Sequence, residues 1–356
     1  QLPPPPLGVD VHAACAFQAR LDGVVQGVAT RRSAPQRRQY AEAVRGGQRI
    51  RRIRGGEHRS VAGMRVFHQR RQGLLGDQPD VAICRTINDR MREAEKAYPG
   101  RFIGLAHVPA LKGPEAAAEL KRCAVELGFP GVVIASELQD QGLDAEALRP
   151  FWKACADLNL YVFIHPLPRV IRWSRMDADD LGRMLGWEFS LMTAAVRLVN
   201  SRLLDELPTL RIQFSHFAGG IGRYMGRIRG FQQRGKWGTA ALARHGRQPP
   251  KPFDHYLDQR LFYDIAGWAG PDHAGEWGAD WVKFGLQELA FSQLVFASDY
   301  PQAVREAGEV ASYVEAIRAL GANGRALAAG VNAEKLIPDL GRRLAAGRKA
   351  SVEVHA

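Results

Sequence analysis

The chain has 356 residues, of which 46% are apolar, and a net charge of +12. This length fits one large barrel or two ordinary domains, and the apolar share suffices for a sizeable core, so we expect a globular protein. No stretch approaches the roughly 18 consecutive apolar residues of a membrane span, which argues against a membrane partner. The four cysteines show no C-x-x-C spacing, and the first residues lack the basic and apolar regions of a secretion signal. We therefore expect reduced thiols and a cytoplasmic protein.

The positive charge is concentrated in one segment. Residues 31–72 contain thirteen arginines, no lysine and only two acids, so they carry nearly all of the excess. Surfaces that bind nucleic acid usually mix lysine with arginine and interleave aromatic residues, whereas this segment has only Tyr40 and Phe67. We therefore expect no nucleic-acid partner. Within a single domain spanning 1–356, residues 15–75 are predicted to be atypical, divergent or poorly ordered, because such a segment buries little surface.

From residue 80 onward, short apolar runs alternate with amphipathic segments. Strands are predicted, in chain order, at 8–12, 102–108, 131–135, 160–165, 210–215, 261–265 and 293–298. Helices are predicted at 79–98, 114–127, 144–158, 185–207, 221–234, 280–290, 307–320 and 332–336. This alternation indicates βαβ units around a parallel sheet. With one further strand expected within 15–80, the pattern predicts a (β/α)8 TIM barrel.

Three predicted strands end on side chains that bind metals or transfer protons, namely His165, His216 and Asp299. In a barrel of parallel strands these ends converge at the C-terminal mouth, where such folds keep their chemistry. Two imidazoles and a carboxylate at one mouth suggest a metal site with nitrogen and oxygen ligands. A doubly wound sheet fits less well, because no glycine-rich phosphate turn follows the first predicted strand.

The residues around these strand ends resemble a known group. The relevant segments are, in order, Val9-Asp10-Val11-His12, Ile164-His165-Pro166, Ser215-His216-Phe217-Ala218-Gly219-Gly220 and Ala297-Ser298-Asp299-Tyr300-Pro301. The ordered set resembles the amidohydrolase superfamily, and most of all its aminocarboxymuconate-semialdehyde decarboxylase branch. The segments Gly186-Trp187-Glu188 and Gly330-Val331-Asn332-Ala333 are also similar to that branch. The resemblance covers about residues 80–340 together with 8–12, and it implies a distorted (β/α)8 barrel, one divalent metal and a homodimer.

The resemblance also implies roles for individual residues. His12, His165 and Asp299 would hold the metal, zinc in the first place and manganese as the alternative. His216 would act on the substrate or on the metal-bound water, and Asp299 would share in catalysis. The family begins with D-x-H-x-H, whereas Ala14 stands where the second histidine is expected. An alanine methyl cannot coordinate a metal. We therefore expect the free energy of metal binding to be weaker by several kcal/mol, out of the roughly 10–16 kcal/mol with which a structural zinc site binds its ion.

Candidate substrate-binding residues lie close to the predicted mouth. The stretch 168–185 is too long for a plain loop and is predicted to overhang the mouth. Within it, Arg169 could pair with a substrate carboxylate, and Trp173 could form a wall of the pocket together with Phe217. The alternatives are a solvated arginine and aromatic residues that belong to the core.

These features predict a metal-dependent carbon–carbon lyase that decarboxylates a small aromatic or muconate-like carboxylic acid. A metal with an open position also serves hydrolysis of a lactone or amide, or hydration, so a hydrolase or hydratase on the same scaffold remains the enzymatic alternative. The vacant ligand position at Ala14 leaves a third alternative, which is a non-catalytic barrel with a degraded metal site.

Overall fold

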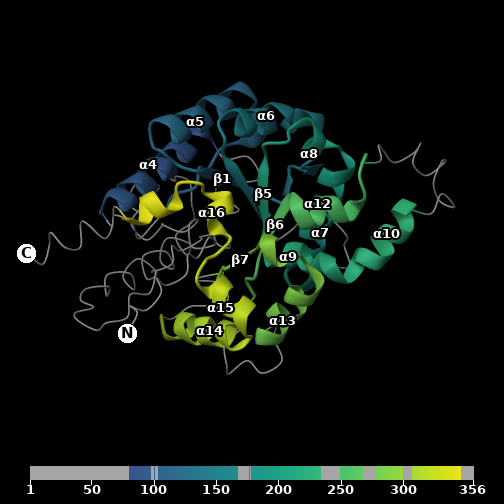
Figure 1. The fold of residues 1–356 in the computed structure, drawn as a ribbon. Coiled ribbons are helices and arrows are strands. Elements are labelled where there is room, and N and C mark those ends of the chain that lie inside the picture. The colour runs from purple at the N-terminus through teal and green to yellow at the C-terminus, as the bar shows by residue number, and fades with distance from the viewer. Residues whose placement is uncertain are drawn as a thin grey trace, which may run out of the picture.

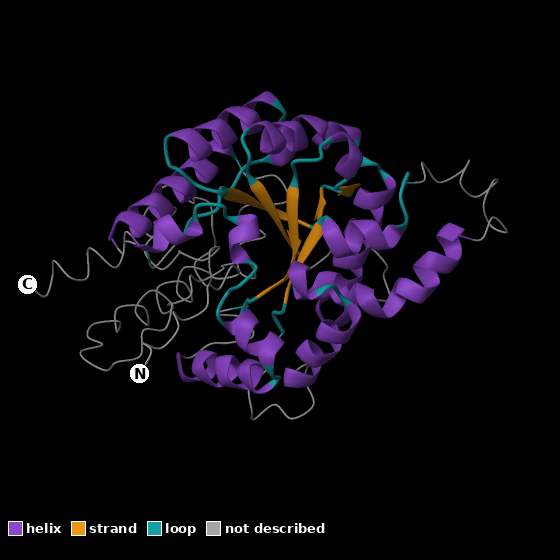
Figure 2. Ribbon diagram, viewed as in Figure 1, coloured by secondary structure: helices purple, strands orange, loops and turns teal. Residues whose placement is uncertain are grey.

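A computed structural model describes residues 80–97, 100, 103–166, 176, 178–233, 249–267, 278–299 and 307–345. Strands lie at the centre of this part of the chain and helices surround them (Figure 2). The predicted first strand 8–12, His12, Ala14, the arginine-rich residues 15–75, Arg169 and Trp173 lie outside the described residues.

The central sheet is parallel. Within the described residues it consists of β1 (Gly131–Ala135), β4 (Tyr161–His165), β5 (Arg211–Phe214), β6 (Leu261–Asp264) and β7 (Leu294–Val295), paired in that spatial order. The register pairs Ala135 with His165 and Ile164 with Phe214. Before β1, Ala106 forms a single parallel bridge with Val132. Since neighbouring strands run in the same direction, their carboxyl ends share one rim of the sheet.

Helices cover the outside of the sheet (Figure 1). They are α4 (Val81–Ala97), α5 (Pro114–Val125), α6 (Arg149–Asp157), α7 (Trp187–Asn200), α8 (Leu203–Glu206), α10 (Met225–Gln233), α12 (Phe253–Gln259), α13 (Gly278–Glu288), α14 (Ala307–Ala319), α15 (Ala322–Ala328) and α16 (Ala333–Leu336). The other described elements are short. They include a π-helical turn at Gly182–Gly186, a turn labelled α9 (His216–Gly220), and a hairpin of β2 (Glu137–Leu138) with β3 (Gln141–Gly142). Four 3-10 helices lie at Ala110–Lys112, Glu146–Leu148, Ile221–Tyr224 and Phe291–Gln293.

Local sequence signals explain several of these elements. Pro114 begins α5, where its missing N–H donor is not needed, and Gly128 follows the helix with a φ of 73°. Every residue of β4 is buried, because side chains on one face of the strand meet the helices and those on the other face meet the barrel interior. A continuous apolar run is therefore the pattern of such a strand.

Several predicted boundaries differ from the observed ones. The helix predicted at 185–207 is divided into α7 and α8, because Arg202 adopts a left-handed conformation with a φ of 65°. The segment predicted as a strand at 102–108 makes only the bridge at Ala106 within its described part. The helices α12 and α15 and the hairpin of β2 and β3 were not predicted, since each is short and has little periodicity.

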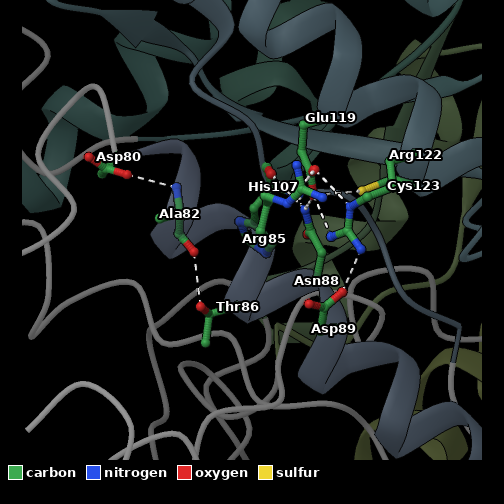
Figure 3. Close-up of polar contacts among 10 residues, drawn as sticks. All are labelled: Asp80, Ala82, Arg85, Thr86, Asn88, Asp89, His107, Glu119, Arg122 and Cys123. Atoms are coloured by element: carbon green, nitrogen blue, oxygen red, sulfur yellow. Dashed lines mark hydrogen bonds and ion pairs between the residues drawn. The ribbon is translucent and has the colours of Figure 1, made fainter. Parts of the chain in front are cut away.

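A buried polar network joins α4 to α5 and to the segment before β1 (Figure 3). The side-chain amide of Asn88 donates to the carbonyl of His107 at 3.0 Å and accepts from the His107 N–H at 2.8 Å. It also donates to Glu119 at 2.8 Å. The Glu119 carboxylate, 1% exposed, accepts from Nε and Nη2 of Arg122 at 2.8 and 2.7 Å. Asn88 therefore satisfies both the N–H and the carbonyl of His107, which are the two groups that a neighbouring strand would otherwise bond.

Replacing Glu119 with alanine is expected to lower the free energy of unfolding by about 1–3 kcal/mol, because Asn88 and Arg122 lose a buried hydrogen-bond acceptor. Arg122 keeps its second partner, Asp89, at 2.6 Å. Urea denaturation measures this change. The matched control is Glu93→Ala on α4, which removes an exposed pair with Arg90 and should change stability by less than about 1 kcal/mol. Equal effects of the two substitutions would contradict the assignment.

The same carboxylate predicts a pH dependence. Burial opposes the charge of Glu119, but hydrogen bonds from Arg122 and Asn88 lower its pKa below the ordinary value. The stabilisation is therefore complete above the unfolded-state pKa of about 4.3 and is lost as the pH falls through the lower folded-state pKa. Glu119→Ala should remove this part of the acid sensitivity in unfolding curves measured from pH 7 downward.

Candidate metal and acid–base site

Two histidines come together at the carboxyl rim of the sheet. His165 is the last residue of β4, and His216 follows β5 after Ser215. Both side chains are nearly buried, and their rings lie edge to face with centroids 6.1 Å apart. Nδ1 of His165 lies 3.2 Å from the carbonyl oxygen of Pro166. This contact suits an Nδ1–H donor and leaves Nε2 as the nitrogen on the side of Asp299.

Asp299 completes the cluster from the segment that follows β7, four residues beyond Val295, because only Leu294–Val295 of the strand predicted at 293–298 is paired. Its Oδ1 lies 3.9 Å from Nε2 of His165, and its Oδ2 lies 3.8 Å from Nε2 of His216. One potential ligand atom from each of the three residues lies within 4.8 Å of the others, and all three residues are buried. The structure thus brings together three residues that are 134 positions apart from first to last along the chain, counted from 165 to 299.

The backbone that carries His216 has an unusual conformation. His216, Phe217 and Ala218 have φ values of 53°, 51° and 51°, and Gly219 and Gly220 continue with 70° and 73°. A residue with a Cβ atom loses about 1–2 kcal/mol in this left-handed region. Such strain persists only where the surroundings impose it, and it is concentrated at functional sites.

Contacts with β6 and α7 hold this left-handed turn. The His216 N–H donates to Oδ1 of Asp264, at the end of β6, over 2.9 Å. Asp264 in turn accepts from Nε2 of Gln213 on β5 at 3.0 Å. On the α7 side, a Cβ atom at Gly219 would lie 2.0 Å from the carbonyl oxygen of Glu188, so only glycine allows this approach.

Glu188 also reaches the His216 ring. Its Oε1 lies 3.0 Å from Nδ1 of His216, and its side chain is 13% exposed. The sequence placed Glu188 and Asp264 in a helix and a strand but assigned neither of them a role. Asp264 carried the same signal as the other strand ends, since it follows the apolar run at 261–263. Glu188 belongs to the segment Gly186-Trp187-Glu188 that resembles the family, but it ends no strand, and its partner His216 lies 28 residues away, so no role was assigned to it.

The carboxylates around His216 favour its charged form. Burial alone would lower the pKa of His216, but the charge and hydrogen bond of Glu188 and the charges of Asp299 and Asp264 raise it to about 9. Burial raises the pKa of Asp264 to about 7, against the opposing influence of the His216 charge and of its hydrogen-bond donors. In the chain by itself, His216 therefore holds a proton between carboxylates.

The donor set fits a divalent cation. Imidazole nitrogen and carboxylate oxygen are ligands of zinc and of related first-row metals, at about 2.0–2.2 Å. Two ligands on opposite sides of one ion can thus lie up to about 4 Å apart, which is compatible with the 3.8 and 3.9 Å separations to Asp299. Asp299 supplies the carboxylate of this three-residue cluster, and a cation would offset the cost of its buried charge.

The remaining candidate is Phe217, which the structure places beside the cluster and inside the core. The residue is 2% exposed, and its ring lies edge-on to Trp281 with centroids 5.5 Å apart. A Cβ atom at Gly285 of α13 would come within 2.2 Å of the Phe217 ring, so the ring packs directly on that helix. A contact of Phe217 with substrate stays a prediction.

Parallel strands whose carboxyl ends carry buried imidazoles and a carboxylate define an α/β barrel with a metal-type site at its mouth. The amidohydrolase family model matches residues 57–338, so the chain belongs to this family. This match confirms the predicted family resemblance. Among the described residues, no helix combines the length and the apolar character needed to cross a membrane.

Characterised relatives support the same branch. The chain is 32% identical to 2-amino-3-carboxymuconate-6-semialdehyde decarboxylase of Dictyostelium discoideum over 158 aligned residues. The alignment covers 44% of this chain and 44% of that protein. It is 34% identical to gamma-resorcylate decarboxylase of Rhizobium sp. over 242 residues, an alignment that covers 65% of this chain and 69% of that protein. The chain thus spans less than half of the first relative and about two thirds of the second.

A solved structure extends the likeness over most of the chain. The structure of dihydroxybenzoic acid decarboxylase from Polaromonas sp., with bound manganese and the inhibitor 2-nitroresorcinol, covers 91% of this chain and 95% of its own, with a TM-score of 0.62 and 20% identity. At this identity the match concerns the fold. Together with the family, it confirms the predicted (β/α)8 barrel.

Proposed function

We propose that this protein is a metal-dependent decarboxylase of small aromatic or muconate-like carboxylic acids. The observation that carries the proposal is the convergence of His165, His216 and Asp299 within 4.8 Å at the carboxyl rim of the barrel. The decarboxylases among its relatives act on acids of this kind by their names, a carboxymuconate semialdehyde and a gamma-resorcylate.

His165 and Asp299 would hold the metal, together with His12 from the first strand. Zinc is our first choice from the ligand set, and the manganese of the Polaromonas structure supports manganese as the alternative. When bound, a divalent cation would polarise substrate oxygens and stabilise the negative charge that develops during reaction. Arg169, Trp173 and Phe217 are proposed to contact the substrate.

His216 would supply the proton that decarboxylation requires. As the bond to the carboxylate breaks, carbon dioxide leaves and the bonding electron pair stays on the carbon. That carbon takes a proton from Nε2 of His216, and the imidazole regains a proton from solvent before the next turnover. The nitrogen on the other side of the ring is occupied by Glu188 at 3.0 Å, which leaves Nε2 directed toward Asp299.

The test is an assay of carbon dioxide release with purified protein loaded with zinc or manganese, against a panel of hydroxybenzoates and muconate derivatives. In D2O, decarboxylation should place one deuterium per turnover at the carbon that lost its carboxylate, which proton NMR detects. Lactones and amides are tested in parallel. Hydrolysis or hydration without carbon dioxide release would instead identify a hydrolase or hydratase, and a protein that binds no metal would be a non-catalytic barrel.

A further inference from the structure

We infer that Glu188 is the positioning residue of His216, and this inference rests on the proposed decarboxylase function. Its carboxylate would fix the imidazole so that Nε2 faces Asp299 and the substrate. The two ring nitrogens already face different carboxylates, since Nδ1 lies 3.0 Å from Glu188 and Nε2 lies 3.8 Å from Asp299.

The first argument concerns the location of the proton on the ring. A carboxylate only accepts hydrogen bonds, so Glu188 selects the form of His216 that carries a proton on Nδ1. This holds for the neutral ring and for the charged ring alike. Proton exchange with a substrate is then confined to Nε2, the nitrogen on the side of Asp299. Without Glu188, the neutral ring can place its single proton on either nitrogen.

The second argument concerns the rigidity of the support. Glu188 lies in the first turn of α7, and its carbonyl oxygen occupies the space where a side chain at Gly219 would begin. Helix α7 is therefore in direct backbone contact with the left-handed turn that carries His216. Ser190, two residues further along α7, donates to the carbonyl of Trp187 at 2.7 Å and lies 2.9 Å from the hydroxyl of Ser136 beyond β1. These contacts tie the carboxylate to the rim of the barrel.

The third argument distinguishes this pair from the other ion pairs of the same helix. On the outer side of α7, Arg197 donates to Asp144 at 2.7 Å, and the Arg197 side chain is 53% exposed. Such an exposed pair contributes little to stability, and neither residue belongs to the cluster of His165, His216 and Asp299. The Glu188 carboxylate is instead nearly buried, and it lies beside an imidazole that in turn adjoins a candidate metal ligand. A carboxylate hydrogen-bonded to Nδ1 holds an acid–base histidine in one tautomer and one orientation.

The experiment compares Glu188→Ala, Glu188→Gln and the matched control Asp144→Asn with the unaltered, metal-loaded protein. Glu188→Ala should lower kcat about 10–100-fold, as the loss of an orienting partner usually does, with KM changed by less than about threefold. The amide of Glu188→Gln can still accept from Nδ1–H, so this variant should retain more activity than Glu188→Ala. Asp144→Asn should match the unaltered protein.

A second readout does not depend on activity. In metal-free protein labelled with nitrogen-15 histidine and held at alkaline pH, where the His216 ring is neutral, the His216 signals, assigned by their absence in His216→Gln, should show the single ring proton on Nδ1. Glu188→Ala should shift these signals toward a mixture of the two neutral tautomers, and Asp144→Asn should leave them unchanged. Unchanged His216 signals in Glu188→Ala, or an unchanged kcat, would overturn the inference. An unaltered protein that releases no carbon dioxide from any acid would overturn the proposed function instead, whatever these spectra show.

Discussion

Replacing Asp299 or His165 with alanine is expected to remove both the bound metal and the decarboxylase activity. A structural zinc site with four ligands is worth roughly 10–16 kcal/mol, or about 2.5–4 kcal/mol per ligand, so losing one of the three proposed protein ligands should lower the affinity by about 10²–10³-fold. Metal analysis of dialysed protein measures this directly. His255→Ala is the matched control, because His255 lies on α12 beside Lys251 and away from the rim. Stoichiometric metal in Asp299→Ala would refute the assignment of that carboxylate.

His216→Ala should behave differently from these two variants. The proposed role of His216 is proton transfer, so its loss should leave the metal content unchanged and lower turnover by about 10²–10⁴-fold, the usual contribution of a general acid–base group. Loss of the metal from His216→Ala would instead make His216 a ligand, which the distances in the cluster also allow.

The second large effect is expected from Gly219→Ala, which should lower the free energy of unfolding by about 2–4 kcal/mol. Strained backbone of this kind is worth about 1–3 kcal/mol, and the new methyl group would also meet the carbonyl of Glu188 at 2.0 Å. The turn must then move away from α7, which separates His216 from its carboxylate. Turnover of the folded variant should therefore fall as well. Urea denaturation and steady-state kinetics measure the two effects.

The control for this substitution is Gly226→Ala on α10. A Cβ atom at Gly226 meets nothing within 4 Å, so alanine should raise stability by about 0.5–1 kcal/mol through its better helix propensity. If Gly219→Ala were as stable and active as Gly226→Ala, the close packing of the left-handed turn on α7 would be required neither for stability nor for turnover.

Much of the candidate site could be predicted because it depends on strand ends. In a parallel barrel, any strand that stops on a polar residue delivers that residue to the same rim, and apolar runs show in the sequence where strands stop. His165, His216 and Asp299 were identified in this way, and the structure brings them within 4.8 Å of one another. The prediction needed neither the order of helices nor any distance, since the direction of the strands is enough.

Other features could be seen only in the folded chain. The helix predicted at 185–207 is interrupted by left-handed Arg202, and nothing in its apolar periodicity indicates this break. Asp264 ends a strand as the other candidates do, but its contact with the His216 N–H depends on the turn that follows β5. A backbone conformation with three non-glycine residues at positive φ is unfavourable locally, so it is not predicted by local preferences.

Apolar runs and the residues that follow them predicted the barrel class and placed His165, His216 and Asp299 at one rim, because periodicity within single segments can be read without knowledge of packing. The family was predicted separately, from the resemblance of the ordered motifs. The contact of Glu188 with Nδ1 of His216 and the packing of Gly219 against the Glu188 backbone arise only in the folded chain. These contacts depend on how α7 packs against the turn that follows β5. That packing is stabilised by residues that are distant in sequence, so no single segment reveals it.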